Sequence, residues 1–356
     1  MEVPQEHASI FAQELREAVR AGGLFARDRA VVAMLSGGRD STCLLDVALA
    51  LLGPGAVSAL HVNYGLREQA GADERHCAAL ARQLGIELET VRVSPPGDGG
   101  AAAQGLGGNV QAWAREVRYA AAAEAAARRD ALIATGHTSS DQVETILYRL
   151  AASPGRRALL GMVPAEGRLI RPLLGVTREQ TAAYCQARGL RWREDESNED
   201  ERYARTRVRH GLLPALRAVH PAAESNVLRT AVLLREETEL LEELVSSELA
   251  GAPHIGIARL RELPAALARM ILVRLAENAV GTYVPQAGDR VEEIVALGRR
   301  GGRAELHVGG LAGAVIENGV LEMVKLPPRI TGAARAAGGP ARHSARSPAE
   351  EPPREG

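Results

Sequence analysis

Apolar and polar positions along the first 150 residues predict strands and helices in alternation. Residues 30–35 (AVVAML) form a continuous apolar run, as a strand buried on both faces requires. Further strands are predicted at 57–62, 87–93 and 131–135. Helical spacing of apolar residues predicts helices over residues 7–21, 42–52, 72–84, 109–129 and 140–150. This alternation indicates an α/β fold built on a doubly wound parallel sheet.

The pattern changes beyond residue 166. Residues 166–220 are mixed and rich in arginine, and 224–249 have the spacing of a long connecting helix. The rest predicts a second, smaller α+β domain, with helices over 260–276 and 290–297 and strands around 304–308 and 313–323.

The last segment, from Pro327, consists mainly of Pro, Ala, Gly, Ser and Arg without apolar periodicity, which is typical of a disordered tail. We therefore expect four parts: an N-terminal helix (1–27), the α/β domain (28–217), the helical connector with the small domain (218–326), and the tail (327–356).

Charge and composition exclude several classes of protein. The net charge of −1 gives no global basic field, so a nucleic-acid surface would have to be local. Lys325 is the only lysine, which excludes a lysine-bearing Walker A loop. Cys43, Cys77 and Cys185 are isolated and form neither a metal motif nor a disulfide framework. With no apolar stretch for a signal peptide or a membrane span, we expect a cytoplasmic protein without a membrane partner.

The sharpest motif is S-G-G-R-D-S at residues 36–41, between the first predicted strand and its helix. Its two glycines let the backbone approach a ligand closely, and Asp40 or Ser41 can cap the helix. Exposed amide groups at a helix N-terminus bind anions. The alternative is an ordinary glycine-containing turn, with Asp40 a plain helix cap.

The string resembles the pyrophosphate loop of the ATP pyrophosphatases, which cleave ATP between the α and β phosphates and activate a substrate as its adenylate. The resemblance implies ATP as a substrate and Mg²⁺ as a cofactor, with Asp40 as the magnesium ligand or orienting carboxylate. We expect the ATP site to comprise Ser36, Gly37, Gly38, Arg39, Asp40, Ser41, His61 and Gly136. For His61 a structural role remains open.

Six further strings narrow the family. They are HVNYGLR (61–67), NVQAWAREVRY (109–119), TGHTSSDQVET (135–145), RPLL (171–174), WRED (192–195) with Asn198, and YARTRVR (203–209). Together, in this order, they resemble the tRNA(Ile)-lysidine synthases over about residues 28–217, and more weakly as far as Val324. The fold this implies is that of the adenine nucleotide alpha hydrolases.

The resemblance implies a two-step ligase reaction in tRNA modification. ATP adenylates the C2 oxygen of the wobble cytidine of a tRNA(Ile) with a CAU anticodon, and pyrophosphate leaves. The ε-amine of free L-lysine then displaces AMP and gives lysidine. The partners implied are that tRNA and free lysine, and a homodimer is left open.

Two acidic residues follow the fourth predicted strand at helical spacing. Asp141 and Glu144 are i and i+3, so they share a helix face at the carboxyl end of the strand. We expect them to hold the lysine ammonium, with one carboxylate taking its proton as general base. The alternative is a solvated acidic helix start, which the helix dipole favours.

Five arginines are candidates for contacts with phosphate. Arg115 and Arg118 share a helix face; we expect Arg115 to act in catalysis by neutralising charge at the α-phosphate, and Arg118 to bind tRNA. We also expect tRNA contacts from Arg205, Arg207 and Arg209. Solvated helix faces or surface ion pairs remain the alternatives, and His137 and Trp113 are as readily structural.

The chain departs from the family at four places. Ser140 replaces the first of two consecutive aspartates, Tyr64 a histidine, Thr206 an asparagine, and residues 152–155 (ASPG) an R-G-S-G-like turn. Because Asp40, Asp141 and Glu144 are present, we still expect an active enzyme.

Three other functions are alternatives. A tRNA 2-thiolation enzyme typically needs a cysteine pair, and the chain has none. A small-molecule adenylating ligase would leave the arginine-bearing second domain without a use. A non-catalytic nucleotide-binding protein is supported only by Ser140 and the altered turn.

Overall fold

The computed structural model describes residues 5–26, 28–66, 69–94, 109–153, 155–194 and 204–327. The chain forms two compact units that divide between Glu236 and Glu237, inside helix α11 (Ala223–Leu249). All but the first residue of the predicted tail (327–356) lie outside the described residues.

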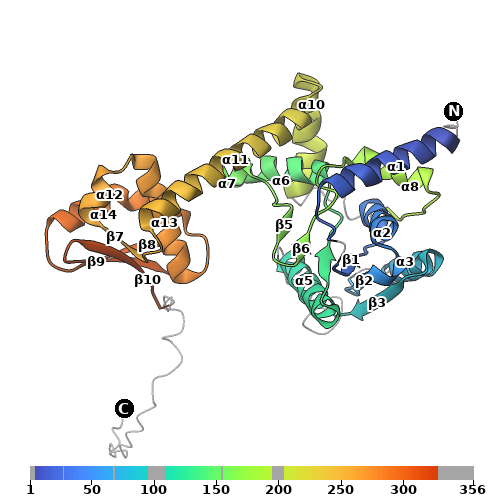
Figure 1. Cartoon of the computed structure of the whole chain (residues 1–356), viewed down its shortest axis with the longest axis horizontal. Helices are drawn as coiled ribbons and strands as arrows, with labels where there is room; N and C mark the ends of the chain where they lie inside the picture. The colour runs from blue at the N-terminus through green and yellow to red at the C-terminus, as the bar shows by residue number, and fades with distance from the viewer. Residues whose placement is uncertain are drawn as a thin grey trace, which may run out of the picture. The chain divides into compact units, whose positions relative to one another are not determined.

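The first unit is built on a six-stranded sheet in the order β3-β2-β1-β4-β6-β5 (Figure 1). Five strands are parallel and only the edge strand β5 is antiparallel. The strands are β1 (Val31–Met34), β2 (Val57–Asn63), β3 (Glu87–Arg92), β4 (Leu132–Ala134), β5 (Ala165–Glu166) and β6 (Leu169–Ile170). The parallel α/β fold expected from the sequence is thus confirmed, with two short strands that the pattern did not predict.

Both faces of this sheet are covered because successive side chains of a strand point to opposite faces. Val31 and Ala33 of β1 pack into one core with α1 (Gln5–Ala21), α2 (Arg39–Leu52), α3 (Ala70–Leu84) and α8 (Arg178–Ala187). Val32 packs into a second core against alanines of α5 (Asn109–Arg129). The continuous apolar run at residues 30–35 reflects this two-sided burial.

Helix α8 is anchored through a buried carboxylate on α2. Asp46, only 2% exposed, accepts hydrogen bonds from Arg16 of α1 (3.1 Å) and from Tyr184 (2.6 Å) and Arg188 (3.1 Å) at the end of α8. Burial raises the pKa of Asp46, but these three donors outweigh it and hold the pKa below its usual value. The anchor fixes α8, whose first residue enters the candidate site.

A further helical layer completes the first unit. Its elements are α6 (Ser139–Ala152), α7 (Arg156–Leu159), α9 (Ala204–Arg207), a π-helical turn (Val208–Leu212) and α10 (Leu213–Val219), with a 3₁₀ turn (Pro54–Ala56) before β2. Val143 and Leu147 of α6 pack with Val208 and Leu213 in a small separate core. This core holds the 204–213 segment against α6.

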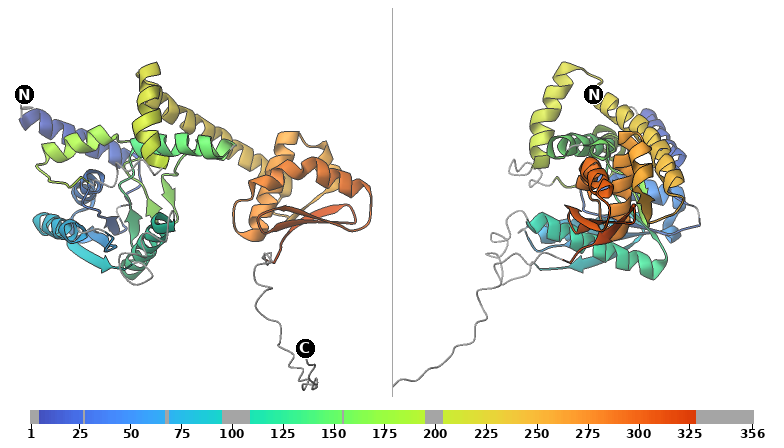
Figure 2. Two further views of the ribbon diagram at one scale, coloured as in Figure 1. Left: turned by 180° about the vertical axis from the view of Figure 1, so that it is seen from behind. Right: turned by 90° about the vertical axis from the view of Figure 1, so that its left-hand side faces the viewer.

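The second unit has an antiparallel sheet in the order β7-β10-β9-β8, with helices on one face (Figure 2). Its elements are β7 (His254–Gly256), α12 (Ile257–Glu262), α13 (Ala265–Val280), a 3₁₀ turn (Pro285–Arg290), α14 (Val291–Arg299), β8 (Ala304–Gly309), β9 (Ala312–Glu317) and β10 (Val320–Lys325). The one helix expected over 260–276 is two, because Pro264 lacks the N–H that a helix interior needs. The run at 313–323 is a hairpin that turns at Asn318 and Gly319, both with positive φ.

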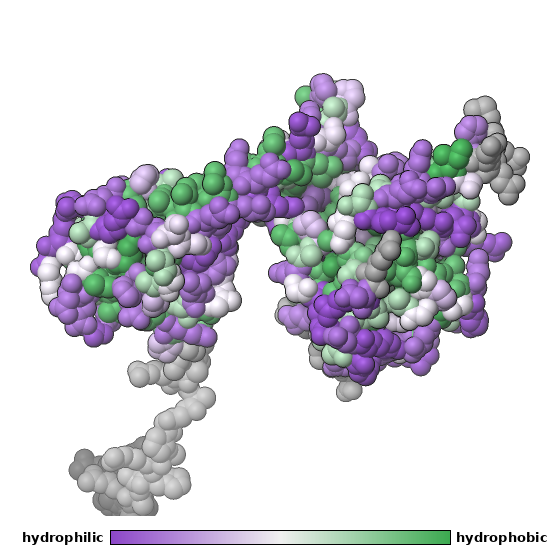
Figure 3. Space-filling view, in the orientation of Figure 1, coloured by the Kyte–Doolittle hydropathy of each residue, from purple (hydrophilic) through white to green (hydrophobic). Residues whose placement is uncertain are grey.

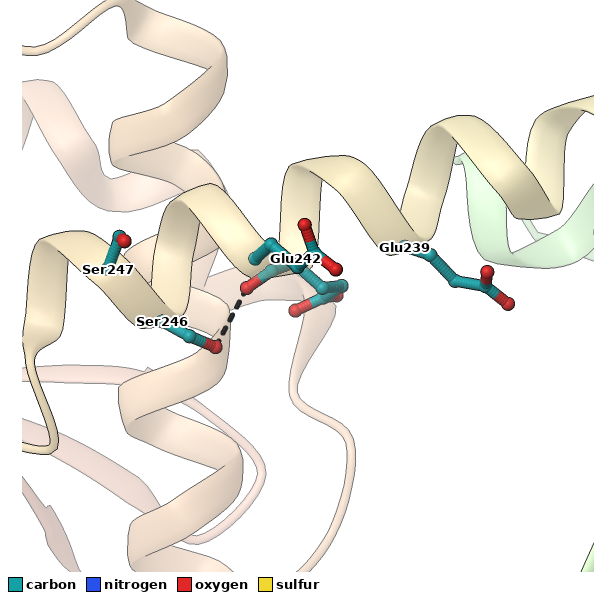
Figure 4. Close-up of a pocket in the computed structure, with 5 residues that line it drawn as sticks. Glu239, Glu242, Ser246 and Ser247 are labelled. Carbon is teal, nitrogen blue, oxygen red and sulfur yellow. Dashed lines mark hydrogen bonds between the residues drawn. The ribbon is translucent and has the colours of Figure 1, made fainter.

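The surface of α11 carries both acidic and apolar residues. Figure 3 shows apolar residues along this helix, and Val232, Leu233, Leu240 and Leu244 are exposed. A shallow hollow of about 790 Å³ is lined by Glu239, Glu242, Glu243, Ser246 and Ser247 (Figure 4). Ser246 donates locally to the Glu242 carbonyl (2.8 Å), and the Glu242 carboxylate pairs with Arg274.

None of the helices in the described ranges is both long and apolar enough to cross a membrane.

Candidate functional site

The S-G-G-R-D-S loop joins β1 to α2 at the carboxyl edge of the sheet. Gly37 has φ +85°, and a Cβ there would lie 3.2 Å from the Sγ of Cys77, so the position requires glycine. Gly38 is the N-cap of α2, and no side chain caps it. The predicted capping by Asp40 or Ser41 is therefore wrong: the Ser41 hydroxyl donates to the Gly38 carbonyl instead (2.8 Å) and accepts from the Ser36 N–H (3.2 Å). The uncapped helix start leaves its N–H groups for an anion.

Two neighbouring strands support this loop. Gly136, just after β4, packs so closely that a Cβ would lie 2.9 Å from the carbonyl carbon and oxygen of Asp40 and 3.0 Å from the Ser41 nitrogen. His61 of β2 is buried below the loop, and its Nδ1 donates to the Leu35 carbonyl (2.9 Å). Both residues predicted at the ATP site thus lie against the loop and support its backbone.

Asp40 lies at the first turn of α2 and faces α8. Its Oδ1 accepts hydrogen bonds from the hydroxyl of Thr181 and from Arg39 Nε (3.2 Å), and Oδ2 lies 3.8 Å from Arg178 Nε. The side chain is 23% exposed. Asp40 therefore connects the loop to α8 and keeps one face open to solvent.

Asp141 both caps the start of α6 and faces the candidate site. Its Oδ2 accepts from the N–H (2.9 Å) and hydroxyl (2.8 Å) of Thr138 in a capping box that starts α6. Its Oδ1 accepts from Arg178 (2.7 Å). Burial raises the pKa of Asp141, but the charge of Arg178 and the Thr138 hydrogen bonds outweigh it and lower the pKa. The carboxylate is therefore charged, with one oxygen in the cap and one in the site.

Glu144, one helical turn further, is fully buried between two guanidinium groups. Its Oε1 accepts from Arg178 (3.0 Å) and Arg209 Nε (2.7 Å), and its Oε2 accepts from Arg209 (3.0 Å). Asp141 and Glu144 thus share one helix face, as the spacing predicts. Arg209, which the sequence predicts to contact tRNA, forms an ion pair with Glu144 and has 26% of its side chain exposed.

Arg178 was not among the predicted site residues, yet it lies close to all three carboxylates of the site. It is the first residue of α8, after the N-cap Thr177, whose capping box with Gln180 fixes the helix start. The buried hydroxyl of Ser140 accepts from the Arg178 backbone N–H (3.2 Å). Ser140, a departure from the family pattern, therefore holds Arg178 in place.

On α5, two predicted arginines lie beside aromatic rings. The guanidinium carbons of Arg115 and Arg118 lie 4.8 Å and 5.7 Å from the centre of the Tyr119 ring. Tyr64 packs edge-on against Trp113 with ring centres 6.0 Å apart. Arg115 is exposed and Arg118 is half-buried, so the two side chains differ in access to solvent.

The remaining predicted arginines lie on α9. Arg205 is exposed and donates to the Thr145 hydroxyl of α6 (2.8 Å). Arg207 is exposed and lines a hollow of about 340 Å³ with Tyr148 and Leu212. The structure therefore places Arg205 at the site and Arg207 at the outer side of α6.

His137 lies between Gly136 and the start of α6, and its Nδ1 is 2.9 Å from the Thr135 hydroxyl. Burial lowers its pKa to about 4. The ring is therefore neutral at neutral pH, and it adds no positive charge to the site.

The titratable side chains do not gather into a multidentate metal site. Among the described residues, no group of three or more His, Cys, Asp or Glu is arranged to hold a metal ion. The three cysteines are free and buried, and burial raises the pKa of Cys77 to about 12. A metal carried by one carboxylate and substrate phosphates, as Mg²⁺ commonly is, would need only Asp40.

Comparison with known families matches residues 7–216 to the model of the PP-loop domain. The chain belongs to the PP-loop family. The match contains the six-stranded sheet, the S-G-G-R-D-S loop and all three carboxylates of the site.

Relatives of this PP-loop protein carry a common name. Proteins named "tRNA(Ile)-lysidine synthase" are 41% identical over 226 residues in Pseudomonas fluorescens, 39% over 284 in Symbiobacterium thermophilum and 36% over 307 in Azoarcus sp.. These alignments cover 61%, 74% and 83% of this chain and 48%, 58% and 65% of the relatives. The family resemblance predicted from the motifs is confirmed, and the chain spans about half to two thirds of the length of these relatives.

A solved structure shares the fold. The U34-tRNA thiolase NcsA from Methanococcus maripaludis, a structure with its [4Fe-4S] cluster, aligns with a TM-score of 0.53 and 16% identity. The alignment covers 64% of this chain and 80% of the thiolase. At this identity the likeness establishes the fold alone.

Proposed function

We propose that this PP-loop protein ligates free L-lysine to C2 of the wobble cytidine in a tRNA(Ile) with a CAU anticodon. The single observation that carries the proposal is the Asp141–Glu144 pair, which is largely buried, ion-paired with arginines, and one strand away from the phosphate loop. The relatives' common name supports the same reaction.

The first step would take place at the phosphate loop. The C2 oxygen of the cytidine attacks the α-phosphate of ATP, the bond between the α and β phosphates breaks, and pyrophosphate leaves. The N–H groups at the uncapped start of α2 would hold the phosphates of that leaving group. Asp40 would hold Mg²⁺ together with the phosphates, where the ion would neutralise charge on the pyrophosphate. Arg115 would neutralise charge at the α-phosphate.

The second step needs a neutral amine. The ε-ammonium of lysine gives one proton to a carboxylate of the Asp141–Glu144 pair, and the amine attacks C2 as AMP leaves with the oxygen. A guanidinium now fills the position that the ammonium needs, because Arg178 contacts both carboxylates. Arg178 also lies 3.8 Å from Asp40 of the phosphate loop. When ATP binds, its phosphates can draw Arg178 away by bidentate hydrogen bonds and free Asp141 for the lysine.

A 2-thiolation reaction is the second candidate, since a tRNA thiolase shares the fold. The described residues favour it less. The three cysteines lie within separate helices rather than in one ligand group, and the raised pKa of Cys77 keeps its thiol protonated.

The direct test is incubation of the full chain with ATP, radiolabelled lysine and a CAU-anticodon tRNA(Ile) transcript. We expect label in the RNA with one AMP released per lysine incorporated. A transcript with a GAU anticodon, which has no cytidine at the wobble position, is the control and should stay unlabelled. Label that enters only from a sulfur donor would establish thiolation instead, and AMP release without any RNA product would contradict both.

A further inference from the structure

A cluster of arginines lies beside the acidic pair, around His137 at the ends of β4 and β6. The two strands are neighbours, and the Thr135 N–H donates to the Ile170 carbonyl (3.1 Å), so His137 and Arg171 lie at adjacent strand ends. Strand β6 is two strands away from β1, which places Arg171 on the order of 10 Å from the phosphate loop. The cluster is therefore separate from the place proposed for the pyrophosphate.

Arg171 is the most deeply buried member. Its side chain is only 6% exposed, one terminal nitrogen donates to the Val163 carbonyl (2.6 Å), and Glu166 is 3.8 Å away with its own side chain largely in solvent. Its buried Nε has no hydrogen-bond partner. A buried guanidinium with an unpartnered N–H lacks one of its hydrogen bonds. A bound oxyanion would accept that hydrogen bond and balance the buried charge.

Two more arginines lie along helix α6, Arg149 of α6 itself and Arg205 of the neighbouring α9. The Arg205 guanidinium donates to the Thr145 hydroxyl, and Arg149 follows Thr145 by one helical turn on the same face. Arg149 donates to the Gly161 carbonyl (2.6 Å). Each of these two guanidinium groups therefore donates one hydrogen bond to a neutral oxygen, and its other N–H groups can bind a ligand.

Arg118 lies on α5 with its guanidinium beside the Tyr119 ring, and its charge also acts on His137. Its buried Nε also has no hydrogen-bond partner. Within the described ranges, no carboxylate lies within ion-pair distance of Arg118, Arg149 or Arg205. Arg178 and Arg209, by contrast, form ion pairs with the carboxylates of Asp141 and Glu144.

The charges are close enough to affect one another. Burial lowers the pKa of His137 to about 4; Asp141 opposes this, and Arg171, Arg205 and Arg118 add to it. Burial and the charges of Arg205, Arg171 and Arg115 lower the pKa of Arg149. Arg171 has only the solvent-exposed Glu166 carboxylate at 3.8 Å, so a bound anion would stabilise the positive charge of these arginines.

We propose that Arg118, Arg149, Arg171 and Arg205 form a single phosphate-binding site, separate from the phosphate loop and from the Asp141–Glu144 pair. Arg149 and Arg171 bond carbonyls only two residues apart, Gly161 and Val163, and Arg205 bonds α6 one turn before Arg149. Planar guanidinium groups match the oxygens of a phosphate group by paired hydrogen bonds. The phosphate belongs either to the RNA backbone next to the reacting base or to ATP. Whether the phosphate comes from RNA or from ATP depends on the proposed function. The existence of a phosphate-binding site does not depend on it.

The test uses two accessible members and one control. Arg205→Gln and Arg149→Gln remove one charge each without emptying the buried core, and Arg82→Gln on the exposed face of α3 is the matched control. Binding of a CAU-anticodon tRNA transcript is measured over a range of salt concentrations, and ATP binding is measured separately. Circular dichroism confirms that each variant is folded.

If the phosphate is that of the RNA, Arg205→Gln and Arg149→Gln should weaken tRNA binding and lower the slope of log K against log salt by about 1, with ATP affinity unchanged. A weakened ATP affinity with an unchanged salt slope would also support the site and assign it to the nucleotide. Folded variants that match Arg82→Gln in both measurements would overturn it. These measurements need no turnover, so a wild-type chain that fails to incorporate lysine would refute the proposed function and leave the site standing.

Discussion

Glu144→Gln is expected to reduce lysine incorporation at least ~100-fold, the effect of removing a general base or the charge that positions the amine. The carboxylate is fully buried and accepts from both Arg178 and Arg209, and an amide would turn an N–H₂ group toward one of them. Breaking a buried ion pair costs about 3 kcal/mol, or roughly 6–12 °C in melting temperature for a unit of this size. Lysine incorporation and thermal melting are measured together.

A second variant separates chemistry from stability. Arg209→Met added to Glu144→Gln removes the partner that has only Glu144 at hydrogen-bond distance, while Arg178 keeps its ion pair with Asp141, and this is less costly than leaving a buried charge unpaired. Its melting temperature should recover in part, while incorporation stays lost relative to Arg209→Met alone. Glu179→Gln, an exposed carboxylate next to Arg178, is the control and should keep full activity. Recovery of incorporation in the double variant would mean that Glu144 has only a structural role.

Gly136→Ala is expected to lower ATP affinity by about tenfold and stability by about 1–3 kcal/mol. The added Cβ would meet the backbone carbonyl of Asp40 at 2.9 Å, and backbone cannot rotate away as a side chain can. The β4–α6 connection must therefore separate from the phosphate loop. ATP binding is measured by calorimetry and stability by denaturant unfolding.

The matched control for this change is Gly175→Ala. A Cβ at Gly175 has no atom within 4 Å and its φ is not in the left-handed region, so ATP affinity and stability should match the parent chain. If Gly136→Ala binds ATP as well as the control, then the close packing of Gly136 on Asp40 is not what shapes the loop.

Most of the first unit could be predicted from the sequence because its signals are local. The run at 30–35 predicts β1, and the S-G-G-R-D-S string predicts the turn that follows it. Strands β5 and β6 have two residues each, too few for any alternation to be visible. They form because β4 offers an edge, which is a tertiary effect.

In the candidate site, too, local features could be predicted from the sequence and tertiary contacts could not. The i, i+3 spacing of Asp141 and Glu144 predicts a shared face, and the structure has it. Arg178 is 34 residues beyond Glu144 in sequence, so its pairing depends on how α8 docks on α2. The Thr177–Gln180 capping box was a visible signal for the helix start, but nothing local indicates which carboxylates Arg178 meets.

We propose that the loop at residues 36–41 and the neighbouring strand ends activate an RNA base with ATP before lysine acts. The most direct measurement is exchange of radiolabelled pyrophosphate into ATP without lysine. We expect exchange with the CAU-anticodon tRNA(Ile) transcript and almost none without RNA, because the base must be present for adenylation to run forward and back. Equal exchange with and without the transcript, or none with it, would contradict the claim.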